Sequence, residues 1–225
     1  LRMQALKFAT AQGLVNDELA DAVAKKYKSL SDEAKSDVLY WLGDNKVASQ
    51  KSLLTQVAAK GGKPAKAAIE ALGKIGGTDA QQVLIDQLGG ENDAEAYRAL
   101  CSFPGKLNIA DALKSAEGDK KLSLLKLASA RHYTNAAKDI FALTQDKTYA
   151  EAALDALPGV VTPDQSKAVI GALTVAKGAK QVQKWQKVGS ACLQSLSADD
   201  QYKEIAQFVN MPQLPNKENL YPLHL

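Results

Sequence analysis

The residue types that most often carry out chemistry are sparse in this chain, and their spacing does not suit it. His132 and His224 are the only histidines, and neither has a cysteine or a second histidine at the spacing of a zinc site. Cys101 and Cys192 are the only cysteines, and no cysteine–histidine pair or serine elbow indicates a nucleophile. The glycine pairs lack the spacing of a phosphate-binding loop. The sequence therefore predicts no catalytic residue, no metal site and no cofactor.

The charge of the chain does not indicate nucleic acid as a partner. The formal net charge is only +3, and the arginines are Arg2, Arg98 and Arg131, so lysine supplies almost all of the positive charge. Arginine is the side chain that best makes paired contacts to phosphates and bases. Two groups of lysines are predicted to lie on a solvated face, with an anionic partner as the alternative: Lys60, Lys63, Lys66 and Lys74, and Lys177, Lys180, Lys184 and Lys187.

A large apolar residue recurs at a nearly constant spacing along most of the chain. Three residues before each of these anchor positions stands another large apolar side chain, and most anchors are followed directly by a small residue. Residues three apart share one face of a helix, so each anchor marks an amphipathic helix. The anchors lie 27 to 31 residues apart, at Leu42, Leu72, Leu100, Leu127, Leu157 and Val188.

The repeated unit is a pair of helices. In residues 64–88, a helix that carries Ile69 and Leu72 is followed by Gly76 and Gly77 and then by a second helix that carries Leu84. Helices this short are marginal alone, so pairs must stack on one another to bury their apolar faces. No long alternating run of β-branched residues indicates a strand. The pattern predicts an all-α fold built from repeated helix pairs.

The segment AAIEALGKIGGTDAQQVLIDQLGGENDAEAYRAL, residues 67–100, resembles HEAT repeats (an armadillo-like family) of the short bacterial type. The resemblance extends over residues 31–189 and implies a right-handed α-α superhelix, a HEAT-like solenoid of about six or seven helix pairs. It also implies that the anchor helices form the inner, concave row. The style of the sequence is similar to HEAT segments of large secreted bacterial proteins that also carry a sugar-processing domain. A secreted or periplasmic location is therefore expected, with a cytoplasmic location as the alternative.

The domain organisation follows from this array. We expect the chain to be a fragment of a larger multidomain protein, since its first residues already read as helix. No apolar run approaches the roughly 20 residues of a membrane span. Cys101 and Cys192 lie three repeat units apart, which predicts two packed thiols rather than a disulfide. The expected parts are N-terminal capping helices (1–30), the repeats (31–189), a C-terminal cap (190–209) and a Pro-rich extended tail or linker (210–225).

The candidate binding surface is the outward row of the anchor helices. Positions two and five residues before an anchor point away from the core, because each residue turns the helix by about 100°. The row is mixed in charge, which does not favour a DNA backbone. Leu122 and Leu125 are predicted to form an apolar spot near mid-array, or alternatively to belong to the core. The candidate residues are Tyr40, Glu70, Glu95, Arg98, Leu122, Leu125, Asp155 and Gln186.

These observations favour a non-catalytic scaffold or protein-interaction module that presents its inner row to a protein segment or to a neighbouring domain of the same chain. One alternative is an enzyme, a HEAT-like DNA glycosylase, which would need a basic face with aromatic residues; Trp41 and Trp185 are five repeat units apart. Another is a bilin-lyase-like repeat protein that binds a tetrapyrrole, against which the aromatic content of 6% argues mildly. The oligomeric state stays open.

Overall fold

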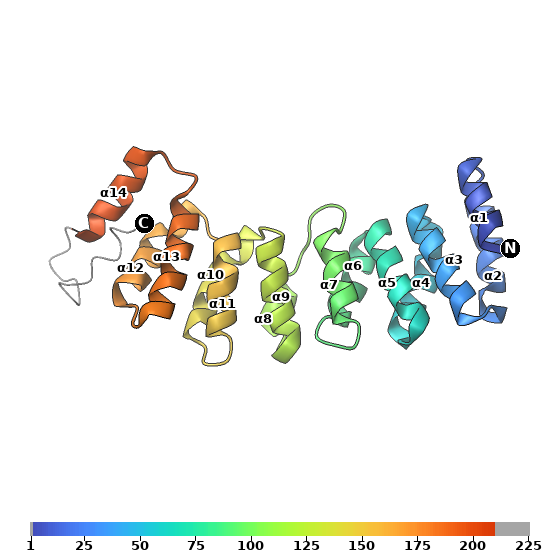
Figure 1. Ribbon diagram of the computed structural model, residues 1–225, viewed down its shortest axis with the longest axis horizontal. Helices are drawn as coiled ribbons and strands as arrows, with labels where there is room; N and C mark the ends of the chain where they lie inside the picture. Colours follow the sequence, from blue (N-terminus) through green and yellow to red (C-terminus); the bar gives the residue numbers. More distant parts are fainter. Residues whose placement is uncertain (1, 210–225) are drawn as a thin grey trace. The chain divides into compact units, whose positions relative to one another are not determined.

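The computed structural model describes residues 2–209, and every regular element in that range is helical (Figure 1). The range contains no strand, which confirms the all-α prediction. The predicted tail, residues 210–225, lies outside the described residues. The α-helices are α1 (Arg2–Ala11), α2 (Asp17–Lys26), α3 (Asp32–Asp44), α4 (Lys51–Lys60), α5 (Lys63–Ile75), α6 (Thr78–Gln87), α7 (Asp93–Cys101), α8 (Ala110–Ser115), α9 (Gly118–Ala130), α10 (Ala137–Ala142), α11 (Ala150–Ala156), α12 (Ser166–Val175), α13 (Ala179–Leu193) and α14 (Ala198–Val209).

Local sequence signals explain where several helices begin and end. The side chain of Asn16 accepts a hydrogen bond from the backbone N–H of Leu19 at 2.8 Å and begins α2, as predicted. Ser31 caps α3 in the same way through the N–H of Ala34. Helix α5 has a proline in its first turn, where no N–H is needed, and ends at Gly76, whose φ of +74° suits glycine.

Contacts divide the chain into two compact units, and the boundary falls inside α9. Unit 1 comprises residues 1–124 and unit 2 residues 125–225. In unit 1, helices α3, α5 and α7 lie side by side in one row, and α4 and α6 pack behind them (Figure 1). In unit 2, α11 packs against α13, and α12 packs against both α13 and α14. The repeat spacing alone does not predict this division.

The anchor register is confirmed. The six anchors fall in or directly after α3, α5, α7, α9, α11 and α13, and all six side chains are fully buried. Of the residues three positions earlier, all are buried except Tyr97, which is half-buried. The small residues predicted beside the anchors do allow close approach: a Cβ added to Gly43 would lie 2.5 Å from the Cα of Ala71, and one added to Gly73 would lie 2.7 Å from the Cβ of Ala99.

The terminal helices are tied to their neighbours by polar contacts. The indole Nε1 of Trp41 donates hydrogen bonds to Thr10 Oγ1 at 2.9 Å and to the Leu6 carbonyl at 3.2 Å, which joins α1 to α3. Ser166 Oγ donates to Glu204 Oε2 at 2.8 Å, which joins α12 to α14. Helix α13 continues to Leu193, and Leu193 forms a buried apolar cluster with Ile170, against which Leu196 and Ile205 pack.

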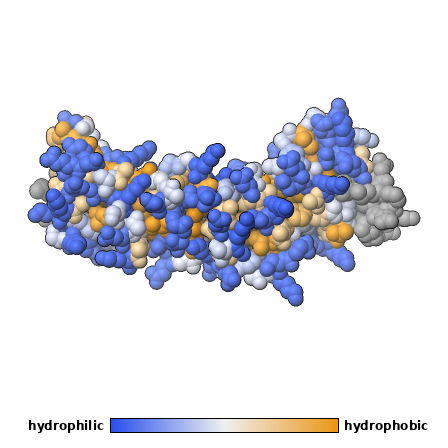
Figure 2. Space-filling view, turned by 180° about the vertical axis from the view of Figure 1, so that it is seen from behind, coloured by the Kyte–Doolittle hydropathy of each residue, from blue (hydrophilic) through white to orange (hydrophobic). Residues whose placement is uncertain are grey.

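The surface of the two units is mostly polar. On the face shown in Figure 2, hydrophilic side chains cover most of the area, and smaller apolar patches lie between them. Large apolar side chains are rarely exposed; Phe8, Leu14, Val175 and Tyr202 are the exceptions in the described range. Each helix therefore turns its apolar face inward, as repeat packing requires.

Candidate functional site

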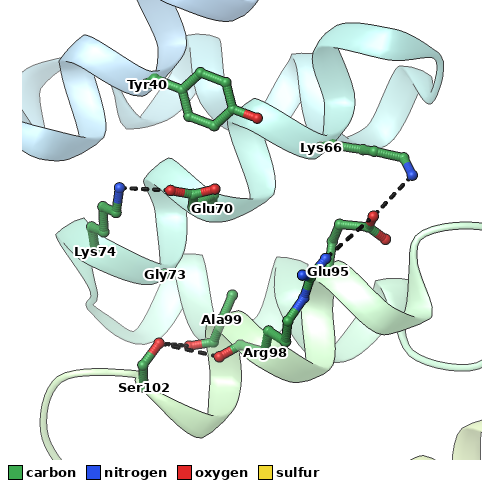
Figure 3. A pocket seen from close by; sticks show the side chains of 9 residues that line it. All are labelled: Tyr40, Lys66, Glu70, Gly73, Lys74, Glu95, Arg98, Ala99 and Ser102. Carbon is green, nitrogen blue, oxygen red and sulfur yellow. Dashed lines mark hydrogen bonds and ion pairs between the residues drawn. The ribbon is translucent and has the colours of Figure 1, made fainter.

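A pocket of about 470 Å³ opens on the outward face of the first helix row in unit 1 (Figure 3). It lies over three successive anchor helices, α3, α5 and α7. Four of the eight residues predicted from the sequence meet there: Tyr40, Glu70, Glu95 and Arg98. The full lining is Tyr40 from α3, Lys66, Glu70, Gly73 and Lys74 from α5, and Glu95, Arg98, Ala99 and Ser102 from α7.

The repeat explains why these residues converge. Tyr40, Glu70 and Arg98 each stand two positions before an anchor, so stacking the three helices brings them into one row. The floor of the pocket is made by Gly73 and Ala99, which touch across the α5–α7 contact. Two such small residues leave no bulky side chain to fill the space above them. The hollow is therefore a consequence of the close packing between α5 and α7.

One side of the pocket carries part of a cluster that we name the acidic triplet: Glu70 and Lys74 line the pocket, and Asp44 lies beside it, paired with Lys74. The ammonium of Lys74 donates to Asp44 Oδ1 and to Glu70 Oε1, each at 2.6 Å. Partial desolvation disfavours the charged form of Lys74, but the hydrogen bonds to Asp44 and Glu70 outweigh it and raise the pKa of the ammonium. Lys74 therefore stays charged, and the triplet holds two negative charges around one positive charge.

The other side carries the reverse arrangement, the basic triplet: Lys66, Glu95 and Arg98. Glu95 Oε1 accepts a hydrogen bond from Lys66 Nζ at 2.9 Å and lies 3.5 Å from an Arg98 guanidinium nitrogen. The hydrogen bond from Lys66 lowers the pKa of the Glu95 carboxyl below its ordinary value of 4.5. Figure 3 shows Glu70 with Lys74 on one side of the pocket and the basic triplet on the other.

The remaining four predicted residues do not line this pocket. Asp155 is exposed and pairs with Lys184 in unit 2 at 2.6 Å, and Gln186 is half-buried on α13. Leu122 is half-buried, but Leu125 is fully buried, so the predicted apolar surface spot is wrong at Leu125. The reason is that α9 buries a much wider arc than one stripe; its buried residues are Ser123, Leu124, Leu125, Leu127 and Ala128.

Sequence reasoning did not predict that Lys66 and Lys74 line the pocket or that they form ion pairs. Lys63 and Lys66 are exposed, as expected for a solvated face. In addition, Lys66 and Lys74 each pair with an acid on the neighbouring anchor helix, as does Lys63 with Glu33. A usable signal was present, because these oppositely charged partners stand 29 or 30 residues apart, which is the repeat period. A search for opposite charges at that spacing would have found them.

The residues considered first for chemistry have ordinary structural positions. His132 is exposed with a φ of +49°, in the loop after α9 as predicted, and its Nδ1 donates to the Gly159 carbonyl at 3.0 Å. Cys101 and Cys192 form no disulfide, as predicted. Burial raises the pKa of the Cys192 thiol to about 11, so it is a poor nucleophile near neutral pH. Within residues 2–209, no three His, Cys, Asp or Glu side chains are grouped as metal ligands.

The comparisons with known proteins do not assign this chain to a family. No protein-family model matches it, and no curated protein or solved structure matches it significantly. None of the described helices has both the length and the apolar content needed to cross a membrane. Both tryptophans are almost completely buried, so in the described structure neither offers an aromatic face for stacking a base or a pigment.

Proposed function

We propose that this chain is a non-catalytic interaction module, a HEAT-like right-handed α-α superhelix that binds a segment of a partner protein or of a neighbouring domain. The observation that carries the proposal is the convergence of four outward residues from three successive repeats on one pocket. A surface built by stacking repeats is rigid, because each helix is held by its neighbours on both sides. A rigid surface can bind a flexible segment without first becoming ordered itself.

The chemistry of the pocket supports binding rather than catalysis. Its titratable groups pair with one another, and none is a histidine or cysteine. Its volume of about 470 Å³ lies within the roughly 300–1,000 Å³ range of ligand sites. The lining combines an aromatic ring, small apolar residues and several charges, which suits the side chains and backbone of a peptide.

A selection from a random peptide library displayed on phage tests this proposal on the whole chain. Peptides enriched on the chain are expected to lose at least about tenfold in affinity, or about 1.4 kcal/mol, for the variant Tyr40→Ala/Arg98→Ala. The matched control is Tyr202→Ala/Lys126→Ala, which removes an exposed tyrosine and an exposed cation in unit 2 and should bind as the parent does.

Two results would contradict the proposal. Enriched peptides that bind the two double variants equally well would place binding elsewhere on the molecule, and a library that yields no enrichment would leave the pocket without a peptide ligand. Trp41 fluorescence during urea unfolding shows whether Tyr40→Ala has disturbed unit 1. For the superhelix, an experimental structure in which the helix pairs turn with left-handed sense would contradict the proposed fold.

A further inference from the structure

The two sides of the unit 1 pocket differ in charge, although the whole network is neutral. The acidic triplet has two carboxylates around one ammonium, and the basic triplet has two cations around one carboxylate. Together with Asp44, which stands beside the pocket next to Lys74, the site is therefore polarised, with a net negative side and a net positive side. Purely structural ion pairs would not require this segregation, since alternating pairs would neutralise each side locally.

Differences in side-chain exposure increase the charge separation that a ligand meets. In the basic triplet, the side chain of Glu95 is only 17% exposed, whereas Lys66 is 56% and Arg98 is 73% exposed. In the acidic triplet, Lys74 is the most shielded member at 39%, whereas Asp44 is 60% and Glu70 is 51% exposed. In each triplet, the residue whose charge is outnumbered has the least exposed side chain. A ligand therefore meets mainly cations on one side and mainly carboxylates on the other.

The spacing of the two sides fits an extended chain. Lys66 and Lys74 are eight residues apart on α5, which corresponds to about 12 Å along the helix. Side chains four residues apart in an extended peptide lie about 13 Å apart and point to the same side. Glu70 stands midway between the two lysines, and the small residues Gly73 and Ala99 lie nearer to the Lys74 end of this stretch.

We propose that the pocket recognises an extended protein segment that carries one acidic and one basic side chain four residues apart. The acid of the segment binds Arg98 and Lys66, and the base binds Glu70 in the pocket and Asp44 beside it. This inference rests on the proposed function and specifies its ligand. A uniformly anionic partner is disfavoured, because the acidic triplet would repel half of it.

Fluorescence polarisation with labelled synthetic peptides of about ten residues tests the charge pattern on the whole chain. The probes place Glu and Lys four residues apart, and in a second set seven or eight residues apart, in both orders, in a Gly/Ser/Ala background. Exposed ion pairs are each worth about 0.2–1 kcal/mol, so two of them should strengthen binding about 2- to 30-fold over a peptide with Gln at both positions. One order should bind more tightly than the other, because the groove has two different ends.

Single substitutions at exposed positions make the test specific to each side. Arg98→Gln should weaken binding of the Glu/Lys peptide and of a peptide with Glu alone, but not of one with Lys alone. Asp44→Asn should weaken the Glu/Lys and Lys-only peptides, but not the Glu-only peptide. Loss of folding would weaken all three together, so this crossed pattern separates recognition from stability. Lys126→Gln, an exposed cation outside the pocket, is the matched control and should change nothing.

The outcomes separate this inference from the function on which it rests. If peptides from the library bind at the pocket but the charged and neutral probes bind equally, the charge pattern is wrong and the binding function stands. If the preferred spacing is seven or eight residues, the ligand is a helix and the extended form is wrong. If neither the library nor any probe yields a peptide that binds, both the function and its ligand are overturned.

Discussion

The two units use the same repeat period but bring their anchor helices together differently. In unit 1, the residue directly after one anchor packs against the residue directly before the next: Gly43 against Ala71, and Gly73 against Ala99. These contacts lie inside continuous helices. In unit 2, Pro158 occupies the position after Leu157, α11 stops at Ala156, and the anchor itself lies in a 3₁₀ turn over Leu157–Gly159.

The close contact in unit 2 is displaced to the ends of the helices. Gly159 packs against the backbone of Ser129, which follows its own anchor by two residues, and the Gly159 carbonyl accepts the His132 Nδ1–H. Elsewhere in unit 2 a large aromatic contact fills the core, with the Phe141 and Trp185 rings 5.5 Å apart. The same period is therefore compatible with two kinds of packing, one through small residues and one through aromatic rings.

Two pockets, one in each unit, also differ in how their charges are arranged. Both units have ion pairs between adjacent anchor helices, including Lys184 to Asp155 in unit 2. A pocket of about 450 Å³ in unit 2 lies at the beginning of α13, and it is lined by Lys177, Lys180 and Lys184 with a single acid, Glu151. Ion pairs between adjacent helices are therefore not enough to give a pocket one negative and one positive side. In unit 1 the two triplets also have a floor of small residues between them.

The largest expected effect is on the independence of the two units. Leu72→Ala and Leu157→Ala each remove a fully buried anchor side chain, and each should cost about 2–5 kcal/mol. The chain has one tryptophan in each unit, Trp41 in unit 1 and Trp185 in unit 2. The variant Trp185→Phe keeps only Trp41 and reports on unit 1, and the variant Trp41→Phe keeps only Trp185 and reports on unit 2. Urea unfolding followed by fluorescence should show Leu72→Ala acting mainly on unit 1 and Leu157→Ala mainly on unit 2.

Two results would break this part of the comparison. Equal shifts of both reporters by either substitution would mean that the chain unfolds as one cooperative array, as nearest-neighbour coupling between repeats can produce. A cost below roughly 1 kcal/mol for Leu72→Ala would instead mean that the side chain is not a core anchor, contrary to the repeat register. Each comparison is made within one reporter background, because Trp41→Phe also removes the hydrogen bonds to Thr10 and Leu6.

The next effect tests the small-residue contacts of unit 1. Gly43→Ala places a methyl group 2.5 Å from the Cα of Ala71, where the backbone must move, and should cost about 1–3 kcal/mol in the unit 1 transition. Gly90→Ala is the matched control, since its nearest neighbour, the Gln87 carbonyl oxygen, would lie at 3.4 Å. If both substitutions cost the same by urea unfolding, then a general effect of replacing glycine with alanine, rather than the α3–α5 approach, determines the result.

Most of the fold could be predicted from the sequence because it depends on periodicity. All six anchors are buried, and the glycines after Leu42 and Leu72 lie at close contacts, since a regular repeat fixes both the helix faces and their neighbours. The division inside α9 could not be predicted in this way. The division depends on how many contacts each helix makes, and the repeat pattern weakens at the short helix α8, which has only six residues.

The candidate site could be predicted only in part. Tyr40, Glu70, Glu95 and Arg98 follow from their positions on the helix wheel, and the structure brings them together. The helical wheel predicts Leu125 on the surface, but the side chain is fully buried. The wheel assumes that every helix exposes the same arc, and α9 does not. Lys66 and Lys74 were missed for a different reason: a single helix does not reveal ion pairs that form only when its neighbour is stacked against it.

The smallest expected effect concerns the acids that pair across anchor helices in the two units. Hydrogen bonds from Lys66 and from Lys180 lower the pKa of Glu95 and of Glu151, respectively, below the ordinary value of 4.5. A carboxyl whose pKa is lower in the folded state stabilises that state above its unfolded pKa, and the contribution is lost as the pH falls through the folded pKa. Both contributions are therefore present near neutral pH and decline below about 4.5.

Glu95→Gln and Glu151→Gln measure the two contributions with the reporter of the matching unit. Glu95→Gln should destabilise unit 1 by less than about 1 kcal/mol near neutral pH, and its difference from the parent should vanish once the pH is below the lowered, folded-state pKa of Glu95. Glu151 is fully exposed, so the effect of Glu151→Gln should be smaller and should disappear in about 1 M salt, where charges are screened beyond roughly 3 Å. The shielded Glu95 should keep more of its effect in salt. Equal salt sensitivity would mean that Glu95 is as solvated as Glu151. The carboxylate of the basic triplet would then not be shielded, and the charge difference between the two sides of the pocket would be smaller than proposed.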